Sequence, residues 1–334
     1  MPKRKYDVFG MGNALVDIVF DASEDFLKTH DIEKGLTTLV DEERQNLLIK
    51  ELHLDENKMQ CGGSAANSII AVNQFGGNCY YACRVADDDH GHFYLDDLKS
   101  TGVDTTYTHS NLPKGITGKC LVMVTNDASR TMQTFLGITT EFSKKEINTS
   151  ALIDSDYLYI EGYLITSDAG KESMKFAKEM AEQNGVKTSL TFSDPAMVKY
   201  FGDGLKEVVG NGVDLLFCNE EEAQLFTGKN NLTEAREELK KYAKNFAITQ
   251  GENGAIIFDG DTFIDIEPYP VKAIDTVGAG DMFAGAFLYG ITHQHSMAEA
   301  GKIASLSSSK VVTQYGPRLE LQQTKNILDG FLKS

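Results

Sequence analysis

The chain has 334 residues, of which 41% are hydrophobic and 24% charged, a composition typical of a folded protein and not of a disordered one. Acidic residues outnumber basic ones by 49 to 32, and the formal net charge of −17 argues against nucleic acid as a partner. The N-terminal residues do not form a signal-peptide core and no stretch approaches ~18 consecutive apolar residues, so we expect a cytoplasmic protein without membrane contact.

The first predicted element is a short strand that ends at the sequence Gly10-Met11-Gly12. This strand delivers Asn13 and Asp17 to the mouth of the sheet. Because a carboxylate accepts two hydroxyl hydrogen bonds, Asp17 suits a vicinal diol such as the ribose 2′- and 3′-hydroxyls. Dinucleotide loops also contain Gly-x-Gly, but the required third glycine is missing here, and the chain contains no G-x-x-x-x-G-K-[ST].

Residues 16–40 and 107–136 form a second kind of segment, in which short alternating stretches such as 121–124 and 131–135 predict antiparallel strands without intervening helices. We interpret these two segments as one small sheet, inserted twice from a large domain of residues 1–15, 41–106 and 137–334. A sheet that emerges from the edge of such a domain can close over a substrate and exclude water.

Two glycines, Gly62 and Gly63, precede a predicted helix of small residues. Their missing side chains allow the backbone to approach a polyol closely, and Asn67, one turn into the helix, offers a donor and an acceptor to the same ligand. The same residues are also compatible with a tight helix–sheet contact in which Asn67 bonds to a loop. The five cysteines are odd in number and include no C-x-x-C, so we expect reduced, mostly buried thiols and no zinc site.

From about residue 150 onward, short apolar runs alternate with longer amphipathic ones, which predicts an α/β fold. One amphipathic segment, 169–184, has apolar residues at helical spacing and is followed by Gly185, a typical C-terminal stop. The apolar runs predict buried parallel strands with helices on both faces of the sheet; they are 157–160, 187–192, 214–218 and 246–249.

The most informative segment is the sequence from Asp275 to Asp281. Gly278, Ala279 and Gly280 form a turn that allows close approach to a ligand, and the apolar run after the turn starts a helix whose free N–H groups point toward an anion. Asp281 lies in the first turn of that helix, where it could act as a base toward an incoming hydroxyl. The residues alone also allow a helix-capping acid with glycines that pack the helix on the sheet.

Together, the elements 62–67 and 275–281 resemble the two hallmark motifs of the ribokinase/pfkB carbohydrate kinase family, and the resemblance spans nearly the whole chain. The resemblance implies a ribokinase-like three-layer α/β/α domain with a small β-sheet lid. It also implies ATP as phosphate donor, Mg²⁺ as cofactor and phosphorylation of a primary hydroxyl on a sugar-like acceptor.

Further residues match the family piece by piece. Asn219 and Glu222 resemble its N-x-x-E element, which implies that they hold Mg²⁺ and the phosphates through water, although a helix N-cap followed by acids explains them equally well. Asp275 resembles a position that contributes to a K⁺ site in some members. The resemblance also implies a set of ATP contacts, which are Thr249, Gly251, Gly254 and Thr276.

Within the family, the spelling Gly12-Asn13-x-Leu15-x-Asp17 resembles the adenosine kinase branch. Arg130 stands where that branch carries an arginine toward the transferred phosphate, and a delocalised cation there stabilises charge in the transition state. A set of apolar residues could form a slot for a purine base, although each also suits a plain core position; these are Leu15, Leu39, Leu136 and Tyr163.

The resulting functional hypothesis is ATP-dependent phosphorylation of the 5′-hydroxyl of a ribonucleoside, with adenosine converted to AMP. The first alternative is a ribose- or fructose-type sugar kinase of the same family. The second is a non-catalytic nucleoside-binding protein that kept the fold. An exposed lid edge is compatible with a monomer and with a homodimer formed through the lid.

Overall fold

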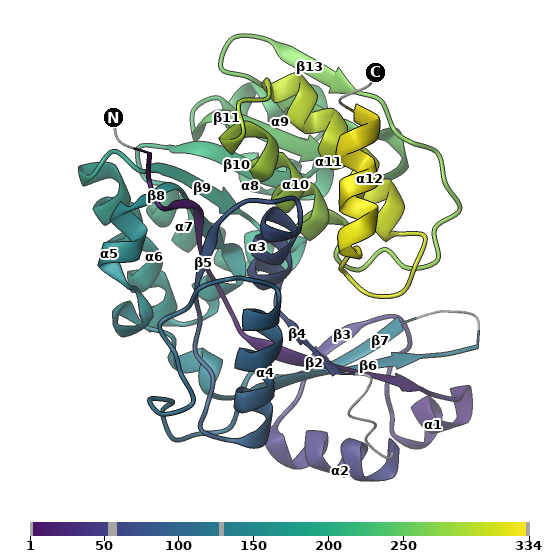
Figure 1. Ribbon diagram of the computed structural model, residues 1–334. Coiled ribbons are helices and arrows are strands. Elements are labelled where there is room, and N and C mark those ends of the chain that lie inside the picture. Colours follow the sequence, from purple (N-terminus) through teal and green to yellow (C-terminus); the bar gives the residue numbers. More distant parts are fainter. Residues whose placement is uncertain (1–2, 53–58, 127–129, 332–334) are drawn as a thin grey trace.

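The computed structural model describes residues 3–52, 59–126 and 130–331, which form two sheets covered by helices (Figure 1). Residues 127–129 of the second predicted lid segment lie outside this description. The strands are β1 (Tyr6–Met11), β2 (Leu15–Asp21), β3 (Thr37–Leu39), β4 (Met59–Gly62), β5 (Cys79–Ala82), β6 (Gly118–Val124), β7 (Arg130–Phe135), β8 (Ser155–Glu161), β9 (Lys187–Thr191), β10 (Val213–Asn219), β11 (Ala243–Thr249), β12 (Ala255–Phe258) and β13 (Phe263–Ile266). The α-helices are α1 (Glu24–Thr29), α2 (Glu42–Leu52), α3 (Ser64–Gln74), α4 (Asp89–Ser100), α5 (Thr149–Ile153), α6 (Asp168–Gln183), α7 (Pro195–Val209), α8 (Glu220–Thr227), α9 (Leu232–Leu239), α10 (Ala279–Thr292), α11 (Met297–Val311) and α12 (Leu321–Phe331).

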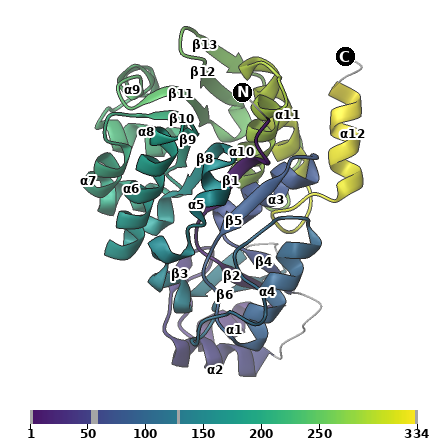
Figure 2. The same ribbon diagram turned by 60° about the vertical axis from the view of Figure 1, so that its left-hand side comes forward.

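The larger sheet has the strand order β13-β12-β11-β10-β9-β8-β1-β5. Strands β5 to β11 of this order run parallel, and β12 and β13 are antiparallel additions at the edge. In β1, Val8 packs in a cluster with α3, α10 and α11, whereas Phe9 packs in a second cluster with α6, α7 and α8. Because successive side chains of a strand point to opposite faces, helices cover both faces of this sheet (Figure 2). The predicted three-layer α/β/α architecture is confirmed.

The predicted elements of the second half of the chain are confirmed as β8, β9, β10 and β11 and as helix α6. The helix begins where Ser167 accepts a hydrogen bond from the Gly170 N–H at 3.0 Å, and the predicted stop, Gly185, has a positive φ of 65°. The parallel strands therefore end along one edge of the sheet, where ligands of open α/β sheets bind.

The smaller sheet, in the order β3-β7-β6-β2-β4, corresponds to the predicted lid with two differences. Strand β4 comes from residues 59–62, which the prediction assigned to the large domain; it pairs with β2 so that Cys61 lies opposite Val16. The prediction of antiparallel strands without helices holds for β6 with β7, and β2 is also antiparallel to the added strand β4. The prediction is wrong for β2–β6 and β3–β7, which are parallel. Parallel neighbours need long crossovers, and α1 and α2 lie in the connections that follow β2 and β3.

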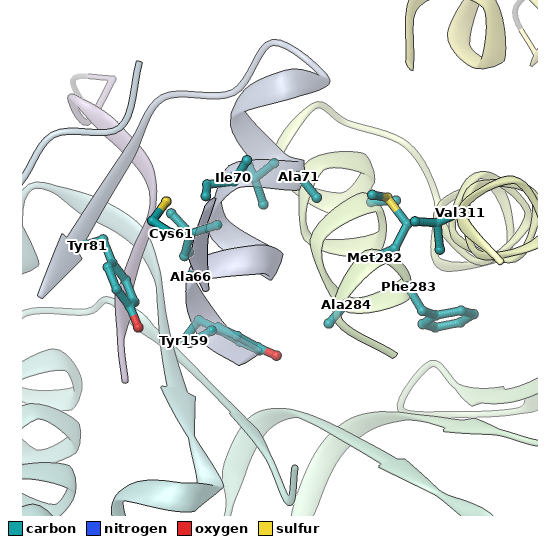
Figure 3. Packing of buried hydrophobic residues seen from close by; sticks show 14 of the residues in the cluster. Cys61, Ala66, Ile70, Ala71, Tyr81, Tyr159, Met282, Phe283, Ala284 and Val311 are labelled. Atoms are coloured by element: carbon teal, nitrogen blue, oxygen red, sulfur yellow. The ribbon is translucent and has the colours of Figure 1, made fainter. Parts of the chain in front are cut away.

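The two helices that follow the glycine motifs, α3 and α10, pack directly against each other (Figure 3). A Cβ added to Gly285 of α10 would lie 2.4 Å from the backbone oxygen of Ser68, so only glycine allows this approach. Small residues on both helices, including Ala71 and Ala284, line the same contact (Figure 3). The N-termini of α3 and α10 are thereby brought to one place above the sheet.

All five cysteines are buried free thiols, as the sequence predicted. Within the described ranges, none of the helices is sufficiently long and apolar to cross a bilayer.

Candidate active site

A pocket of about 660 Å³ lies between the carboxyl ends of the parallel strands and the lid, a size typical of a small-molecule site. Most of the residues singled out in the sequence line it, although they come from distant parts of the chain. They are Asn13, Leu15, Asp17, Leu39, Gly63, Asn67, Leu136, Tyr163, Asn219, Glu222, Thr249, Gly278, Gly280 and Asp281.

Asp281 occupies the first turn of α10, whose N-cap is Gly278 in a left-handed conformation with φ 77°. Its carboxylate accepts hydrogen bonds from the Ser64 hydroxyl at 2.6 Å and from the Asn67 Nδ2 at 3.0 Å. The side chain is thus oriented by α3 across the pocket, and not simply by its own helix terminus. Burial raises the pKa of Asp281 to about 6, against the two hydrogen bonds, so its carboxylate is a stronger base than that of an ordinary aspartate.

Asn67 contributes more than this donor. Its side chain is 6% exposed, and its Oδ1 atom is buried without a hydrogen-bond partner among the described residues. Since buried polar atoms are normally paired, this oxygen is available to a hydroxyl group of a ligand in the pocket. The alternative interpretation, in which Asn67 bonds only to a loop, does not match these contacts.

Gly63 precedes α3 with a φ of 108°, and a Cβ added there would lie 2.2 Å from the backbone oxygen of Asn13. We expect Gly63→Ala to lower acceptor kcat/KM at least ~10-fold, because the backbone must move at the place where it approaches the ligand. Gly76→Ala is the matched control, since Gly76 has a similar φ of 110° but a Cβ added there would lie 4.0 Å from its nearest neighbour, the Tyr289 Cε2. Steady-state kinetics and Tm of both variants test this, and equal effects of the two substitutions would contradict the close-approach argument.

Asp17 and Asn13 stand beside this glycine pair. Asp17 of β2 packs against Gly62, where an added Cβ would lie 2.3 Å from the Asp17 Oδ2. Burial raises the pKa of Asp17 to about 7, opposed by the charges of Arg318 and Arg130. The Asn13 Oδ1 accepts from the Thr139 hydroxyl at 3.1 Å, so the Asn13 amide is held with its nitrogen available as a donor.

Glu161, which the sequence analysis did not single out, ties two parts of the pocket together. This fully buried carboxylate ends strand β8 and accepts from the Asn13 N–H at 3.1 Å and from the Ala65 N–H at 2.8 Å. Burial raises its pKa to about 7. A carboxylate directly after the apolar run 157–160 was the available signal, because parallel strands present their carboxyl ends to the site.

The turn from Gly278 to Gly280, called the anion turn below, differs in detail from the expectation. Ala279 does not line the pocket, and its N–H donates to the Thr276 carbonyl at 3.2 Å, whereas Gly280 lies on the wall and occupies a first-turn position where a helix leaves N–H groups unpaired. Arg130 is not on the wall either. Its guanidinium forms an ion pair with Asp275 at 2.9 Å, with side chains only 8% and 2% exposed. The Arg130 Nε atom is buried without a hydrogen-bond partner among the described residues.

Asp275 is correspondingly saturated by protein donors. Besides Arg130, its carboxylate accepts from the Val277 N–H at 3.1 Å and the Gly316 N–H at 2.9 Å. These contacts do not favour the Asp275 side chain as a direct ligand of K⁺ in this conformation.

Asn219 and Glu222 form a reciprocal capping box at the start of α8. The alternative stated from the sequence, a helix N-cap, is therefore correct in geometry, yet both residues also line the pocket. Burial raises the pKa of Glu222 to about 7. The described residues place no neutralising cation on this buried carboxylate. A carboxylate oxygen is a donor that Mg²⁺ prefers, so this pair is the place where the pocket would accommodate the metal.

The strand-end loop after β11 is mainly a turn. Thr249 lines the pocket, whereas Gly251 and Gly254 do not. Gly251–Asn253 is a 3₁₀ turn, and the Gln250 N–H donates to the Gly254 carbonyl at 2.9 Å to close the β11–β12 hairpin. Thr276 is exposed outside the wall. Of the five residues predicted to contact ATP, counting Asn219, the structure thus brings Thr249 and Asn219 to the pocket.

The apolar slot is present on the lid side of the pocket. Leu15, Leu136 and Tyr163 line it with Leu39, which is 66% exposed and leaves the slot open toward solvent. The wall also contains apolar residues that were not predicted, among them Met132 of β7 and Met197 of α7. Apolar walls of this kind suit an apolar or aromatic part of a ligand.

The fold and the pocket define a class of protein: a phosphoryl-transfer enzyme in which a carboxylate at a helix N-terminus faces an acceptor site under a lid. A family model described as pfkB family carbohydrate kinase matches residues 41–324. The chain belongs to the pfkB family of carbohydrate kinases, and it is a phosphotransferase.

Individual relatives have different acceptors in their names. Adenosine kinase 2 of Arabidopsis thaliana is 25% identical over 331 residues, which cover 92% of this chain and 94% of that protein. The structure of adenosine kinase from Sinorhizobium meliloti is 30% identical with a TM-score of 0.88, and that of a probable sugar kinase from Rhizobium etli is 31% identical with a TM-score of 0.87. Both alignments cover 98% of this chain and 99% of the other.

Proposed function

We propose that the protein transfers the γ-phosphoryl group of Mg·ATP to the 5′-hydroxyl of a ribonucleoside, with adenosine as the acceptor. The observation that carries this proposal is the Asp281 carboxylate, held by Ser64 and Asn67 in the same pocket as Asp17 and an apolar slot. These three features match the three parts of a nucleoside. Asp17 can accept hydrogen bonds from the ribose hydroxyls, Asp281 can act as general base toward the reacting 5′-hydroxyl, and the apolar slot can hold the nucleobase. Conversion of adenosine to AMP would place the protein in purine salvage.

In this mechanism, Asp17 and Asn13 bind the ribose hydroxyls together with Asn67 and the Gly62–Gly63 backbone. Asp281 takes the proton from the 5′-hydroxyl as the hydroxyl oxygen attacks the γ-phosphorus, while the bond from that phosphorus to the β,γ-bridging oxygen breaks and ADP leaves. The backbone N–H of Gly280, in the first turn of α10, stabilises the charge on the phosphoryl oxygens. Arg130 adds its charge once it leaves Asp275. Asn219 and Glu222 would hold Mg²⁺, which neutralises charge on the phosphates when bound.

The acceptor kcat/KM should fall as the pH decreases through about 7 to about 6, the raised pKa values of Asp17 and Asp281. Both carboxylates act in the ionised form, so protonation removes the diol acceptor and the base. An unperturbed aspartate, with a pKa of about 3.9, would place this loss near pH 4 instead. A pH–rate profile at saturating Mg·ATP tests the prediction, and full activity down to about pH 5 would contradict it.

A coupled ADP-release assay tests the proposed function itself. The acceptor panel comprises adenosine, inosine, guanosine, cytidine, ribose and fructose, each with Mg·ATP and with or without K⁺. Highest turnover on adenosine supports the proposal. A free sugar as the best acceptor would reject the nucleoside assignment but keep the role of Asp281, and no turnover with any acceptor would favour a binding protein.

The sugar-kinase alternative is supported by the relative named as a probable sugar kinase. The lid side of the pocket argues for the nucleoside, because the apolar side chains of Leu15, Leu136 and Met132 outnumber the hydroxyl-bearing Thr37 and Thr134 there, which suits a base better than a second sugar or a phosphate.

A further inference from the structure

The connection between α11 and α12 reaches the acceptor side of the pocket through Arg318. Pro317 packs against the anion turn, since a Cβ added to Gly278 would lie 2.3 Å from the Pro317 Cβ. The next residue, Arg318, has a side chain that is only 13% exposed. Its backbone oxygen is held by the Gln314 amide at 2.6 Å. The guanidinium therefore extends inward from an anchored turn.

Arg318 and Asp97 together hold both polar backbone groups of Cys61. The Arg318 Nη2 donates to the Cys61 carbonyl, and its Nη1 pairs with the Asp97 Oδ2 at 3.0 Å. The same Asp97 oxygen accepts from the Cys61 N–H at 2.7 Å. Cys61 lies in β4, the edge strand of the lid, so the ion pair occupies hydrogen-bonding groups that an edge strand otherwise leaves open.

This clamp lies directly before the glycine pair that shapes the acceptor site. Gly62 packs against the Asp17 carboxylate and Gly63 approaches the Asn13 backbone oxygen, and neither glycine has a side chain that could fix its position. Positional control of these two peptides must come from their neighbours, and Cys61 is the neighbour that Arg318 and Asp97 hold.

The charge of Arg318 also lies close to Asp17, because its Nη2 donates to the carbonyl of Cys61 and the Asp17 carboxylate packs against the next residue, Gly62. Burial raises the pKa of Asp17, and the largest opposing influence is the positive charge of Arg318. The other charges that face Asp17 are Arg130 of β7, which lowers its pKa, and Asp281 of α10, which raises it. Cys120 of β6 also faces Asp17, but burial raises the pKa of this thiol to about 12, so it is neutral.

We propose that Arg318 is a positioning residue of the acceptor site, which fixes β4 and the Gly62–Gly63 backbone through Cys61 and holds a positive charge beside the Asp17 carboxyl group. The kinetic part of the proposal rests on the proposed function. The electrostatic part does not, because it concerns Asp17 in the protein without substrates.

Two substitutions separate the two actions. Arg318→Met removes the charge and the donors, whereas Arg318→Lys retains a charge but not the forked contact with Cys61 and Asp97. The matched control is Arg84→Met, since Arg84 is a similarly buried arginine that pairs with Glu146 and Glu141 away from the pocket. For Arg318→Met we expect the adenosine KM to rise about 10-fold, as for a lost charged hydrogen bond, while the ATP KM changes less than about 2-fold.

The second readout is the ¹³C titration of the Asp17 carboxyl group in the substrate-free protein, assigned with Asp17→Asn. We expect the Asp17 titration to move to higher pH in Arg318→Met and to stay near the wild-type position in Arg318→Lys and Arg84→Met. Arg318→Lys should still raise the adenosine KM, which keeps the test valid if Arg318→Met does not fold.

An Asp17 titration that does not move in Arg318→Met would overturn the proposal. So would equal increases in the adenosine KM and the ATP KM that follow the fall in Tm. Wild-type protein that does not phosphorylate adenosine would reject the proposed function alone. In that case the titration, which needs no acceptor, still decides the role of Arg318.

Discussion

Replacing Asp281 by asparagine should lower kcat at least ~10²-fold while leaving the dissociation constant of the nucleoside nearly unchanged, as expected for loss of a general base. The amide keeps the size of the side chain and can still pair with Ser64 and Asn67, which hold the carboxylate in the wild type at 2.6 and 3.0 Å. Only the ability to take the proton from the attacking hydroxyl is lost. Rapid-quench kinetics of the phosphoryl-transfer step, together with calorimetric titration of adenosine, measure the two quantities separately.

Asp89→Asn is the control for this substitution. Asp89 also lies in the first turn of a helix, α4, but it is exposed and does not line the pocket. Its substitution should leave kcat within ~2-fold of the wild type, because surface changes of this kind have small effects. If Asp281→Asn weakened nucleoside binding as much as it slowed turnover, Asp281 would be a binding group and not the base.

The second large effect is expected at Asp17. Asp17→Asn should lower the adenosine kcat/KM about 10²-fold with little change in the ATP KM, because two hydrogen bonds to a charged group contribute about 3 kcal/mol. An amide offers only one oxygen to the diol. Its NH2 group is a donor at the position where the second carboxylate oxygen accepted a hydrogen bond from a hydroxyl. The Asp17 carboxylate lies against Gly62 and lines the pocket. Because asparagine has nearly the same volume as aspartate, the substitution changes the charge there without changing the packing.

Deoxynucleosides test whether this effect passes through the ribose. With 2′,3′-dideoxyadenosine, wild type and Asp17→Asn should have nearly equal kcat/KM, because the hydroxyls that Asp17 binds are absent. Asp21→Asn, at the exposed end of the same strand, is the matched control. A full 10²-fold difference that persists with the dideoxy acceptor would show that Asp17 acts on something other than the diol.

Several features of this protein follow from local sequence alone. Short apolar runs indicated β8, β9, β10 and β11, and the amphipathic stretch before Gly185 indicated α6, because strand and helix periodicity depend on neighbouring residues. The position of Asp281 in the first turn of α10 was predictable for the same reason, since Gly278 to Gly280 mark the start of that helix.

The lid shows where local patterns become insufficient. Its alternating stretches indicated strands, but their parallel pairing of β2 with β6 and the addition of β4 could not be read from them. Strand pairing depends on which distant segments meet, and residues 59–62 form a run of only four residues that ends in a glycine, which weakens any strand pattern.

The partners of the site residues were decided by tertiary structure. Ser64 meets Asp281 across 217 positions of sequence, Glu161 joins Asn13 to the start of α3, and Arg318 reaches Cys61 across 257 positions. Arg130, which the family resemblance directed toward phosphate, is paired with Asp275. Residue types and spacing determine which chemistry a segment can offer. Hydrogen bonds and ion pairs also require donor and acceptor atoms of separate segments to lie within about 3 Å of each other, and only the packing of the sheets and helices in the folded chain brings them that close.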